Sequence, residues 1–422
     1  RGASRIRIAI RVPPAASFRA GGKVDLVALV ERRIGRRRRR RRWERARARV
    51  CVILARICGA AKLGLLSVWK ASLQGRGLSS PIIVGDRLFL SAAEGADQSK
   101  LVVMCFHAVS GERLWKKTFL ATGRTMCHEK TCVAAPTPVS DGESLYILFS
   151  SNDLICLDLK GQLRWLRGIT VDYPNVSNSL GMASSPVWVD GVLVVQVEND
   201  SQSMALGVDP RTGKNLWKLD DRPKGANWTS PIPLPQMDPP CVALQSSKGV
   251  DLVEARSGHL RASYKEGAST IPSSVLFGST LLTPSHGLTA LDLSQAEGDL
   301  PILWRAKSFS PATASPMVMD NAVFVVNNAG VLTRGSLDGG KRQWQVRLKG
   351  PFSASAVGFG HHQFWVNESG LVQVVDVSGE EGEIVSQLDL QETVLATPSI
   401  SNGSLYLRSD QSLWKLGTPP IL

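Results

Sequence analysis

The side chains best suited to chemistry crowd into one segment, residues 118–136. An arginine, two cysteines, a histidine, a glutamate and a lysine fall within nine positions of it: Arg124, Cys127, His128, Glu129, Lys130 and Cys132. A polar cluster of this kind on a long connection can hold an anionic or peptide ligand. Adjacent cysteine and histidine side chains rarely reach the same ion together, and no fourth ligand is visible, so we predict no metal site.

Two further polar segments, residues 172–178 and 222–228, have a similar composition. We predict that Lys224 and Asn227 act together with Arg124, His128 and Glu129 in one ligand-binding pocket. The alternative is a hydrogen-bonded or disulfide-bonded loop that only covers the mouth of a channel. The residues alone leave both interpretations open.

Seven cysteines in 422 residues are too few for a disulfide scaffold. Cys127 and Cys132 lie close together in a loop-like stretch, so the sequence leaves open a disulfide between them, which would imply an oxidising compartment. Free thiols fit the sequence equally well. No hydrolase elbow, phosphate-binding loop or paired-carboxylate motif stands out, and we predict no catalytic residues.

The elements that position these segments form a repeat. From residue 66 onward, short alternating apolar strands separated by Gly, Asp or Asn turns recur between a Ser/Thr-Pro start and a closing tryptophan. The clearest copy begins at Ser80-Pro81 and closes at Trp115. Period-two alternation is typical of antiparallel strands, and a period of about 40 to 50 residues is typical of propeller blades. We predict an all-β fold, an eight-bladed β-propeller of four-stranded antiparallel blades.

Three of the eight copies are irregular. The fourth ends at Tyr264 where a tryptophan is expected, and the seventh has Ile384-Val385 at its closing position. The eighth ends near Leu416 with three strands, while an isolated closing strand around Val68 precedes the first copy. We predict that residues 68–70 pair beside residues 413–416 and close the ring, which removes two exposed sheet edges. The propeller then spans 66–422 and follows a separate segment, 1–65.

The closing motif resembles a known family. Val-Asp-Pro-Arg-Thr-Gly-Lys-Asn-Leu-Trp at residues 208–217 and Leu-Ile-Cys-Leu-Asp at 154–158 resemble the tryptophan-docking repeat of the pyrroloquinoline-quinone (PQQ)-like propellers, in the quinoprotein alcohol dehydrogenase-like superfamily. The resemblance covers roughly residues 66–416. It is similar to the smaller, non-enzymatic members, among them the propeller lipoprotein of outer-membrane assembly. Redox enzymes and non-catalytic scaffolds share this fold, so the fold does not fix the function.

The resemblance also implies what a quinoprotein enzyme would need. Those enzymes hold PQQ with an adjacent pair of cysteines, a tryptophan platform and a Ca²⁺ ion bound by acidic and amide side chains, with an aspartate as base. Here no two cysteines are adjacent, and no C-x-x-C-H haem motif is present. We therefore expect no cofactor, and PQQ with Ca²⁺ remains the alternative.

The net charge of +14 is concentrated at one end of the chain. Residues 1–62 carry 20 Lys and Arg against 3 Asp and Glu, including an unbroken run of arginines at 36–42, whereas the remainder carries 30 against 33. The folded part is thus slightly acidic, and we expect no nucleic-acid binding through it. For the leader, the sequence leaves open a disordered segment, a degraded export signal or a nucleic-acid arm.

These observations favour an exported, monomeric, non-catalytic propeller that acts as an interaction platform for a protein or a cell-envelope component. Peripheral association with a membrane is compatible with that role. The alternatives are a PQQ-dependent dehydrogenase and a sensor that binds a small ligand at the loop-rich face. We expect an extracytoplasmic location, periplasmic or secreted.

Overall fold

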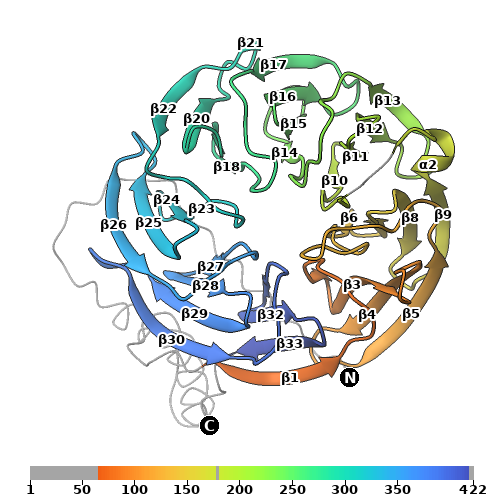
Figure 1. Cartoon of the computed structure of the whole chain (residues 1–422), viewed down its shortest axis with the longest axis horizontal. Coiled ribbons are helices and arrows are strands. Elements are labelled where there is room, and N and C mark those ends of the chain that lie inside the picture. The colour runs from red at the N-terminus through yellow and green to blue at the C-terminus, as the bar shows by residue number, and fades with distance from the viewer. Residues whose placement is uncertain (1–64, 177–179, 418–422) are drawn as a thin grey trace, which may run out of the picture. The chain divides into compact units, whose positions relative to one another are not determined.

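Eight antiparallel sheets stand in a ring around a common axis (Figure 1). The computed structural model describes residues 65–176 and 180–417. Seven of the sheets have four strands. The remaining sheet, the fourth along the chain, has a fifth, short strand added at its outer edge. This confirms the predicted all-β, eight-bladed propeller. Residues 1–64 lie outside the described residues, so the prediction for the leader stays a prediction.

The first four blades are continuous in sequence, and each runs from an inner to an outer strand. Their strands are β2 (Ile82–Val84), β3 (Arg87–Glu94), β4 (Lys100–His107) and β5 (Arg113–Leu120); β6 (Val139–Ser140), β7 (Ser144–Leu148), β8 (Asp153–Asp158) and β9 (Leu163–Gly168); β10 (Val187–Val189), β11 (Val192–Val197), β12 (Met204–Val208) and β13 (Asn215–Leu219); β14 (Ile232–Leu234), β15 (Cys241–Ser246), β16 (Gly249–Glu254) and β17 (Leu260–Tyr264).

The next three blades repeat this order, and the eighth takes its outer strand from the beginning of the propeller. Their strands are β18 (Val275–Phe277), β19 (Thr280–Thr283), β20 (Leu288–Asp292) and β22 (Ile302–Ala306); β23 (Met317–Met319), β24 (Ala322–Val326), β25 (Val331–Ser336) and β26 (Arg342–Arg347); β27 (Val357–Phe359), β28 (His362–Val366), β29 (Leu371–Asp376) and β30 (Glu383–Asp389); β31 (Ser399–Ser401), β32 (Ser404–Arg408), β33 (Ser412–Gly417) and β1 (Leu66–Ser72).

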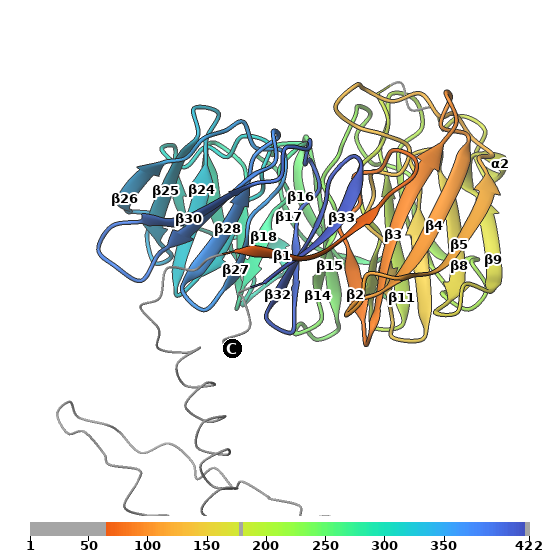
Figure 2. The same ribbon diagram turned by 90° about the horizontal axis from the view of Figure 1, so that it is seen from below.

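The predicted closure of the ring is confirmed. Strand β1 pairs antiparallel with β33, and Trp69 lies opposite Lys415 while Lys70 lies opposite Trp414. Strand β1 lies on the rim of the ring, outside β33, which separates it from β32, and in Figure 2 it crosses in front of β33. Within the described residues, helix is limited to α2 (Ile169–Asp172), and none of it is long and apolar enough to cross a membrane.

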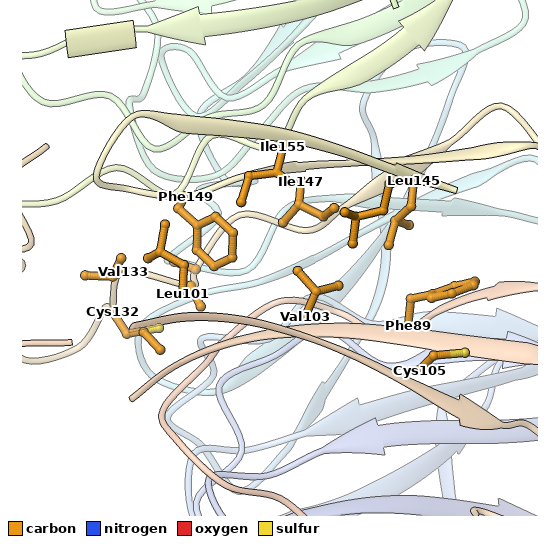
Figure 3. Close-up of a cluster of buried hydrophobic side chains, with 14 residues drawn as sticks. Phe89, Leu101, Val103, Cys105, Cys132, Val133, Leu145, Ile147, Phe149 and Ile155 are labelled. Atoms are coloured by element: carbon orange, nitrogen blue, oxygen red, sulfur yellow. The ribbon is translucent and has the colours of Figure 1, made fainter. Parts of the chain in front are cut away.

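The core is divided among the junctions between blades. Eight apolar clusters of buried side chains each combine residues of two neighbouring sheets. The cluster between blades 1 and 2, for example, joins Phe89 and Val103 to Leu145 and Ile147, as Figure 3 shows. A neighbouring blade covers each face of each sheet. The second and third strands of the blades are therefore buried on both faces and are largely apolar.

The closing tryptophans dock on the following blade. Trp165 of β9 lies over Gly213 in the turn between β12 and β13, and its indole N–H donates to the Pro210 carbonyl at 2.9 Å. Gly213 has a φ of +73°, and a Cβ there would lie 2.8 Å from the indole ring. The repeat therefore needs glycine in this turn for two reasons, backbone conformation and the close approach of the ring.

A ring of hydroxyl groups explains the recurring Ser/Thr start. The backbone N–H of Thr137 donates to Ser185 Oγ at 2.9 Å, and the N–H of Ser185 donates in turn to Ser230 Oγ at 2.9 Å. The same bond joins each blade to the next at five further junctions, whose donors are Ser80, Ser230, Ser273, Ser315 and Ser355. These bonds tie neighbouring inner strands together where they begin.

The sequence placed the closing position of two blades incorrectly. In blades 1 to 4, 6 and 7 a β-bulge lies between the turn glycine and the closing position four residues later, and by this register the fourth blade has Ala262 at the tryptophan position, two residues before Tyr264. In the seventh blade the equivalent residue is Ser386 and not Ile384 or Val385. A tryptophan at the closing position of blade 7 would dock on the turn between the third and outer strands of blade 8. Those strands are β33 and β1, which come from opposite ends of the propeller, so blade 8 has no continuous turn there.

Blade 4 compensates for its missing tryptophan with an additional strand. The turn between β20 and β22 is extended and forms β21 (Gly298–Asp299), which pairs parallel with β17 at Ala262 and Ser263. Ala296 and Leu300 from the same turn pack in one buried cluster with Ala262. The apolar area of an indole is thus partly replaced by side chains from the neighbouring blade.

Candidate functional site

The long polar links lie at one end of the blades. Because the strands alternate in direction, every link from an outer strand to the next inner strand lies at the same end as the loop between the second and third strands. The other two turns of each blade lie at the opposite end. The predicted segment 118–136 covers the end of β5 and the link between blades 1 and 2, and α2 begins the link between blades 2 and 3.

Hydrogen bonds from several blades hold the first link in place. The Thr122 hydroxyl donates to Asp153 Oδ1 at 2.6 Å, and the Thr122 N–H also reaches this carboxylate. The His128 N–H donates to the Leu180 carbonyl at 2.9 Å, and the Glu129 carbonyl accepts a bond from the Arg76 guanidinium. The link is therefore fixed to blade 2, to the next link and to the link that enters blade 1.

An ion pair extends this anchoring to a distant blade. Lys130 Nζ lies 3.2 Å from Glu368 Oε2, which belongs to the loop between β28 and β29 of blade 7. The same carboxylate accepts a bond from Ser353 Oγ at 2.8 Å. Because Lys130 and Glu368 belong to blades on different sides of the ring closure, this contact holds the link over the end of the propeller.

The disulfide left open by the sequence is not formed. Cys127 and Cys132 are both free thiols. Figure 3 shows the Cys132 side chain among apolar neighbours of the first core cluster, where burial raises the pKa of its thiol to about 11. The Cys127 sulfur instead lies 3.6 Å from the Gln98 amide. The two side chains have separate environments, and the cysteines carry no information about an oxidising compartment.

The predicted ligand-binding residues divide into two groups. Arg124, His128, Glu129 and Lys224 are exposed, whereas Asn227 is 3% exposed. The Asn227 amide donates to Glu198 Oε2 and to the Gln245 carbonyl, both at 2.8 Å. Its own oxygen accepts from the N–H and hydroxyl of Thr229, which is the local turn that asparagine favours.

Asn227 belongs to a buried ionic network between blades 3 and 4. Arg222 Nε lies 2.6 Å from Glu198 Oε1, and Arg222 Nη1 lies 2.5 Å from Asp251 Oδ2. Burial raises the pKa of Glu198 above its ordinary value, although Arg222 and Asn227 both favour the ionised form. These contacts order the third link, and the Asn227 amide is fully used in doing so.

Exposed apolar side chains on the first two links are the feature that sequence reasoning missed. Leu120 is 71% exposed, Met126 56%, Val171 69% and Leu180 40%. We name this region, residues 120–130 and 169–176 together with Leu180, the link surface. Leu120 and Met126 fall in the predicted polar connection 118–136, and no periodic pattern covers Val171 or Leu180, so no sequence signal distinguished these exposed apolar residues from buried ones.

The two halves of the link surface pack tightly together. A Cβ on Gly123 would meet the Ser151 carbonyl and Thr170, and one on Gly168 would meet Thr122. A Cβ on Gly181 would likewise lie only 2.8 Å from the Cβ of Cys127. The exposed apolar side chains therefore stand on a backbone that is fixed at several points, with Arg124, His128 and Glu129 between them.

An open polar depression borders the link surface. Its volume is about 490 Å³, and its walls include Gln74, Arg76, Glu94 and Gln98. Gln98 accepts a hydrogen bond from the Val133 N–H at 3.0 Å, which joins the depression to the first link. Lys116 Nζ lies 2.7 Å from Glu94, so that carboxylate is neutralised within the blade.

The described residues contain no adjacent cysteine pair and no cluster of three His, Cys, Asp or Glu side chains that could hold a metal ion. Nowhere in residues 65–176 and 180–417 do three or more His, Cys, Asp or Glu side chains converge in a manner that could hold a metal ion. The described cysteines are not adjacent, and Cys132 is enclosed in the core. The adjacent cysteine pair that the resemblance to quinoprotein enzymes implies is thus missing from this chain.

The arrangement of blades, docking tryptophans and closing strand defines a PQQ-like repeat propeller. The chain belongs to the family described as outer membrane protein assembly factor BamB, whose pattern matches residues 66–201, 99–275, 250–355 and 329–418. This confirms the resemblance inferred from the closing motif. No curated protein matches the sequence.

Solved structures of a BamB protein and of two dehydrogenases share the fold. BamB from Moraxella catarrhalis is 15% identical, with a TM-score of 0.61 over 84% of this chain and 97% of that chain. Quinohemoprotein alcohol dehydrogenase from Comamonas testosteroni is 12% identical, with a TM-score of 0.66 over 85% and 78%. A europium-containing methanol dehydrogenase is 11% identical, with a TM-score of 0.66 over 84% and 93%. At these identities the likeness establishes the fold alone.

Proposed function

We propose that this protein is a non-catalytic interaction platform, exported from the cytoplasm, that binds a protein of the cell envelope through the link surface. The observation that carries the proposal is the group of exposed apolar side chains, Leu120, Met126, Val171 and Leu180, on two rigid links. Apolar side chains bordered by charged ones are typical of protein interfaces. Family membership supports a partner in the envelope, because the family is described by a factor of outer membrane protein assembly.

Charge is suited to orienting such a partner. Arg124, His128 and Glu129 stand exposed among the apolar side chains, and Lys224 is exposed on the third link. Charges at the rim of an interface contribute to the rate and specificity of association more than to its affinity. We therefore assign these four residues to the rim of the interface. On this proposal the protein acts as a monomer and needs no cofactor.

The experiment compares two substitutions within the link surface with one outside it. Met126→Asp and Val171→Asp place a charge where an apolar contact is expected, and each should weaken binding at least about tenfold, the equivalent of about 1.4 kcal/mol. Val109→Asp is the matched control, because Val109 is 66% exposed in the turn between β4 and β5 at the opposite end of blade 1. The readout is quantitative co-purification of envelope proteins with the full chain.

Three results would contradict the proposal. The first is that Val109→Asp reduces co-purification as much as Met126→Asp does. The second is an alcohol- or sugar-dependent reduction of dye by the protein after addition of PQQ and Ca²⁺, which would make it a dehydrogenase. The third is a thermal shift with a small molecule from cell extract that Arg124→Ala and Lys224→Ala abolish, which would make it a sensor. Cell fractionation of the native product tests the extracytoplasmic location.

A further inference from the structure

Docking between blades follows one chemical rule along the ring. In the turn between the third and outer strands, a carbonyl accepts a hydrogen bond from a side chain of the preceding blade. The indole N–H groups of Trp115, Trp165, Trp217 and Trp304 donate to the carbonyls of Leu159, Pro210, Ala255 and Leu337 at 3.3, 2.9, 2.8 and 2.7 Å. At two further junctions the equivalent carbonyls of Ala108 and Val377 accept from Tyr406 and Arg334 instead.

The junctions between blades 4 and 5 and between blades 7 and 8 depart from this rule, and of these two the first has a continuous turn on which a side chain could dock. Ala262 occupies the tryptophan position of β17, and Leu293 is the equivalent carbonyl in the turn after β20. Among the described residues, no side chain of blade 4 donates to the Leu293 carbonyl, in contrast to the six junctions above. Ala296 and Leu300 fill part of the space that an indole would take.

A cavity adjoins this junction, and the turn that carries the Leu293 carbonyl forms part of its wall. Its volume is about 320 Å³, within the range of ligand-binding pockets. Its walls come from the turns of both blades and from the outer strand of blade 4, and they include Met237, Asp238, Arg261, Ser279, Leu293 and Ala296. Because these turns lie at the opposite end of the blades from the links, the cavity is separate from the link surface.

We propose that this cavity is a receptor for a tryptophan side chain presented by a partner protein. The four junctions closed by Trp115, Trp165, Trp217 and Trp304 show what such a turn carbonyl accepts, the indole N–H of a docked tryptophan. Leu293 and Ala296 supply apolar walls, and the Met237 thioether can contact an aromatic ring favourably. The inference goes beyond the proposed function, because it names a second site and the chemistry of its ligand.

Arg261 adds a preference for an aromatic ring over an aliphatic side chain. Its guanidinium is held by Glu297 on one side and lies 3.7 Å from Glu254 Oε1 on the other. A guanidinium fixed in this way presents a planar cation to the cavity, which attracts the face of an indole. Leucine would fill the apolar volume but would offer no ring face to the Arg261 guanidinium and no donor to the Leu293 carbonyl.

The test uses the full-length protein and the peptide acetyl-Gly-Gly-Trp-Gly-Gly-amide. The ¹³C-methyl signal of Met237, identified by its loss in Met237→Leu, should shift saturably as the peptide is added. The same peptide with leucine in place of tryptophan should bind at least about tenfold more weakly. No saturable shift, equal binding of the two peptides, or binding of free indole without binding of the tryptophan peptide would each overturn the proposal.

Two variants place the binding in this cavity. Ser294→Trp puts an indole at the rim from an exposed turn position and should reduce peptide affinity at least about tenfold. Lys160→Trp is the control, because Lys160 holds the same turn position in blade 2, where Trp115 already fills the junction. Ala262→Trp should also abolish binding by supplying the missing indole. Unchanged affinity in a folded Ser294→Trp protein would overturn the assignment, and none of these results depends on the link surface.

Discussion

At the scale of single residues, stability depends on a contact between tryptophan and glycine that recurs from blade to blade. Gly111, Gly161, Gly213, Gly258, Gly340 and Gly382 each lie against a tryptophan ring of the preceding blade, close enough to exclude a Cβ. A buried aromatic contributes through its large apolar area, and the indole N–H requires a partner. Trp115, Trp165, Trp217 and Trp304 meet both requirements in the same turn, whereas the buried indole N–H groups of Trp69 and Trp344 have no hydrogen-bond partner among the described residues.

Gly213→Ala separates the close approach of the ring from the backbone conformation. The added methyl group would meet Trp165 at 2.8 Å, so we expect a loss of about 2 to 4 kcal/mol in the free energy of unfolding. Gly191→Ala is the control, because its φ of +77° is nearly the same while nothing lies within 4 Å. It should cost about 1 kcal/mol, the conformational part alone. Equal destabilisation in a denaturant titration would show that the ring contact is unimportant.

The recurring tryptophan predicted the architecture correctly but not the closing residue of every blade. The recurring Trp predicted the number of blades and the closing strand correctly, because a large residue at a fixed spacing reports the packing of one sheet on the next. Tyr264 was assigned to the tryptophan position because it is the aromatic residue near the end of the outer strand. The β-bulge after the turn glycine instead puts Ala262 at that position. A count from the glycine, four residues in each regular blade, would have found it.

At the scale of elements, the inner strands are tied to one another by side chains and not by a continuous sheet. Ser185 Oγ accepts from the Thr137 N–H, and the Ser185 N–H donates onward to Ser230. The sequence signalled these residues as Ser/Thr-Pro but did not show that each hydroxyl serves the preceding blade. That role depends on a contact between residues about 45 positions apart, which no local pattern contains.

Ser185→Ala tests this connection. It leaves the Thr137 N–H without an acceptor, and we expect a loss of about 1 to 3 kcal/mol. Ser185→Thr should restore most of this stability, since threonine holds the same position at Thr137 and Thr397. Amide exchange at Thr137 gives a local readout and should accelerate in Ser185→Ala only. If the alanine and threonine variants are equally stable, the hydroxyl is not the stabilising group.

For the residues of the links, too, the sequence predicted some side-chain environments and missed others. Composition identified the exposed charges Arg124, His128, Glu129 and Lys224, because charged residues on long connections stay in solvent. It did not separate Asn227, whose amide is consumed by Glu198 and Gln245, since those partners come from other strands. The packing of one link on the next decides whether an apolar link residue such as Val171 is buried or exposed. Amino-acid composition carries no information about this packing.

At the scale of the whole molecule, closure of the ring joins the two ends of the propeller. Strand β1 completes blade 8, and Lys70 on β1 forms an ion pair with Glu392 in the link between blades 7 and 8, at 2.5 Å. Partial burial alone would raise the pKa of Glu392, but hydrogen bonds from Lys70, Ser409 and Ser412 outweigh it and hold the pKa below the ordinary value of 4.5. The ionised carboxylate therefore favours the closed ring.

This ion pair makes closure sensitive to acid. Because the folded pKa of Glu392 is depressed, its contribution is fully present above pH 4.5 and is lost as the pH falls through the lower, folded value. Lys70→Met should lower the free energy of unfolding by about 0.5 to 1 kcal/mol at neutral pH, a modest amount because Lys70 is nearly half exposed. The difference from wild type should shrink steadily below pH 4.5 in thermal unfolding followed by circular dichroism. In a Glu392→Gln background, Lys70→Met should have no effect at any pH, and a persistent effect there would mean that packing of the lysine stem on Trp414, and not the charge, stabilises the closure.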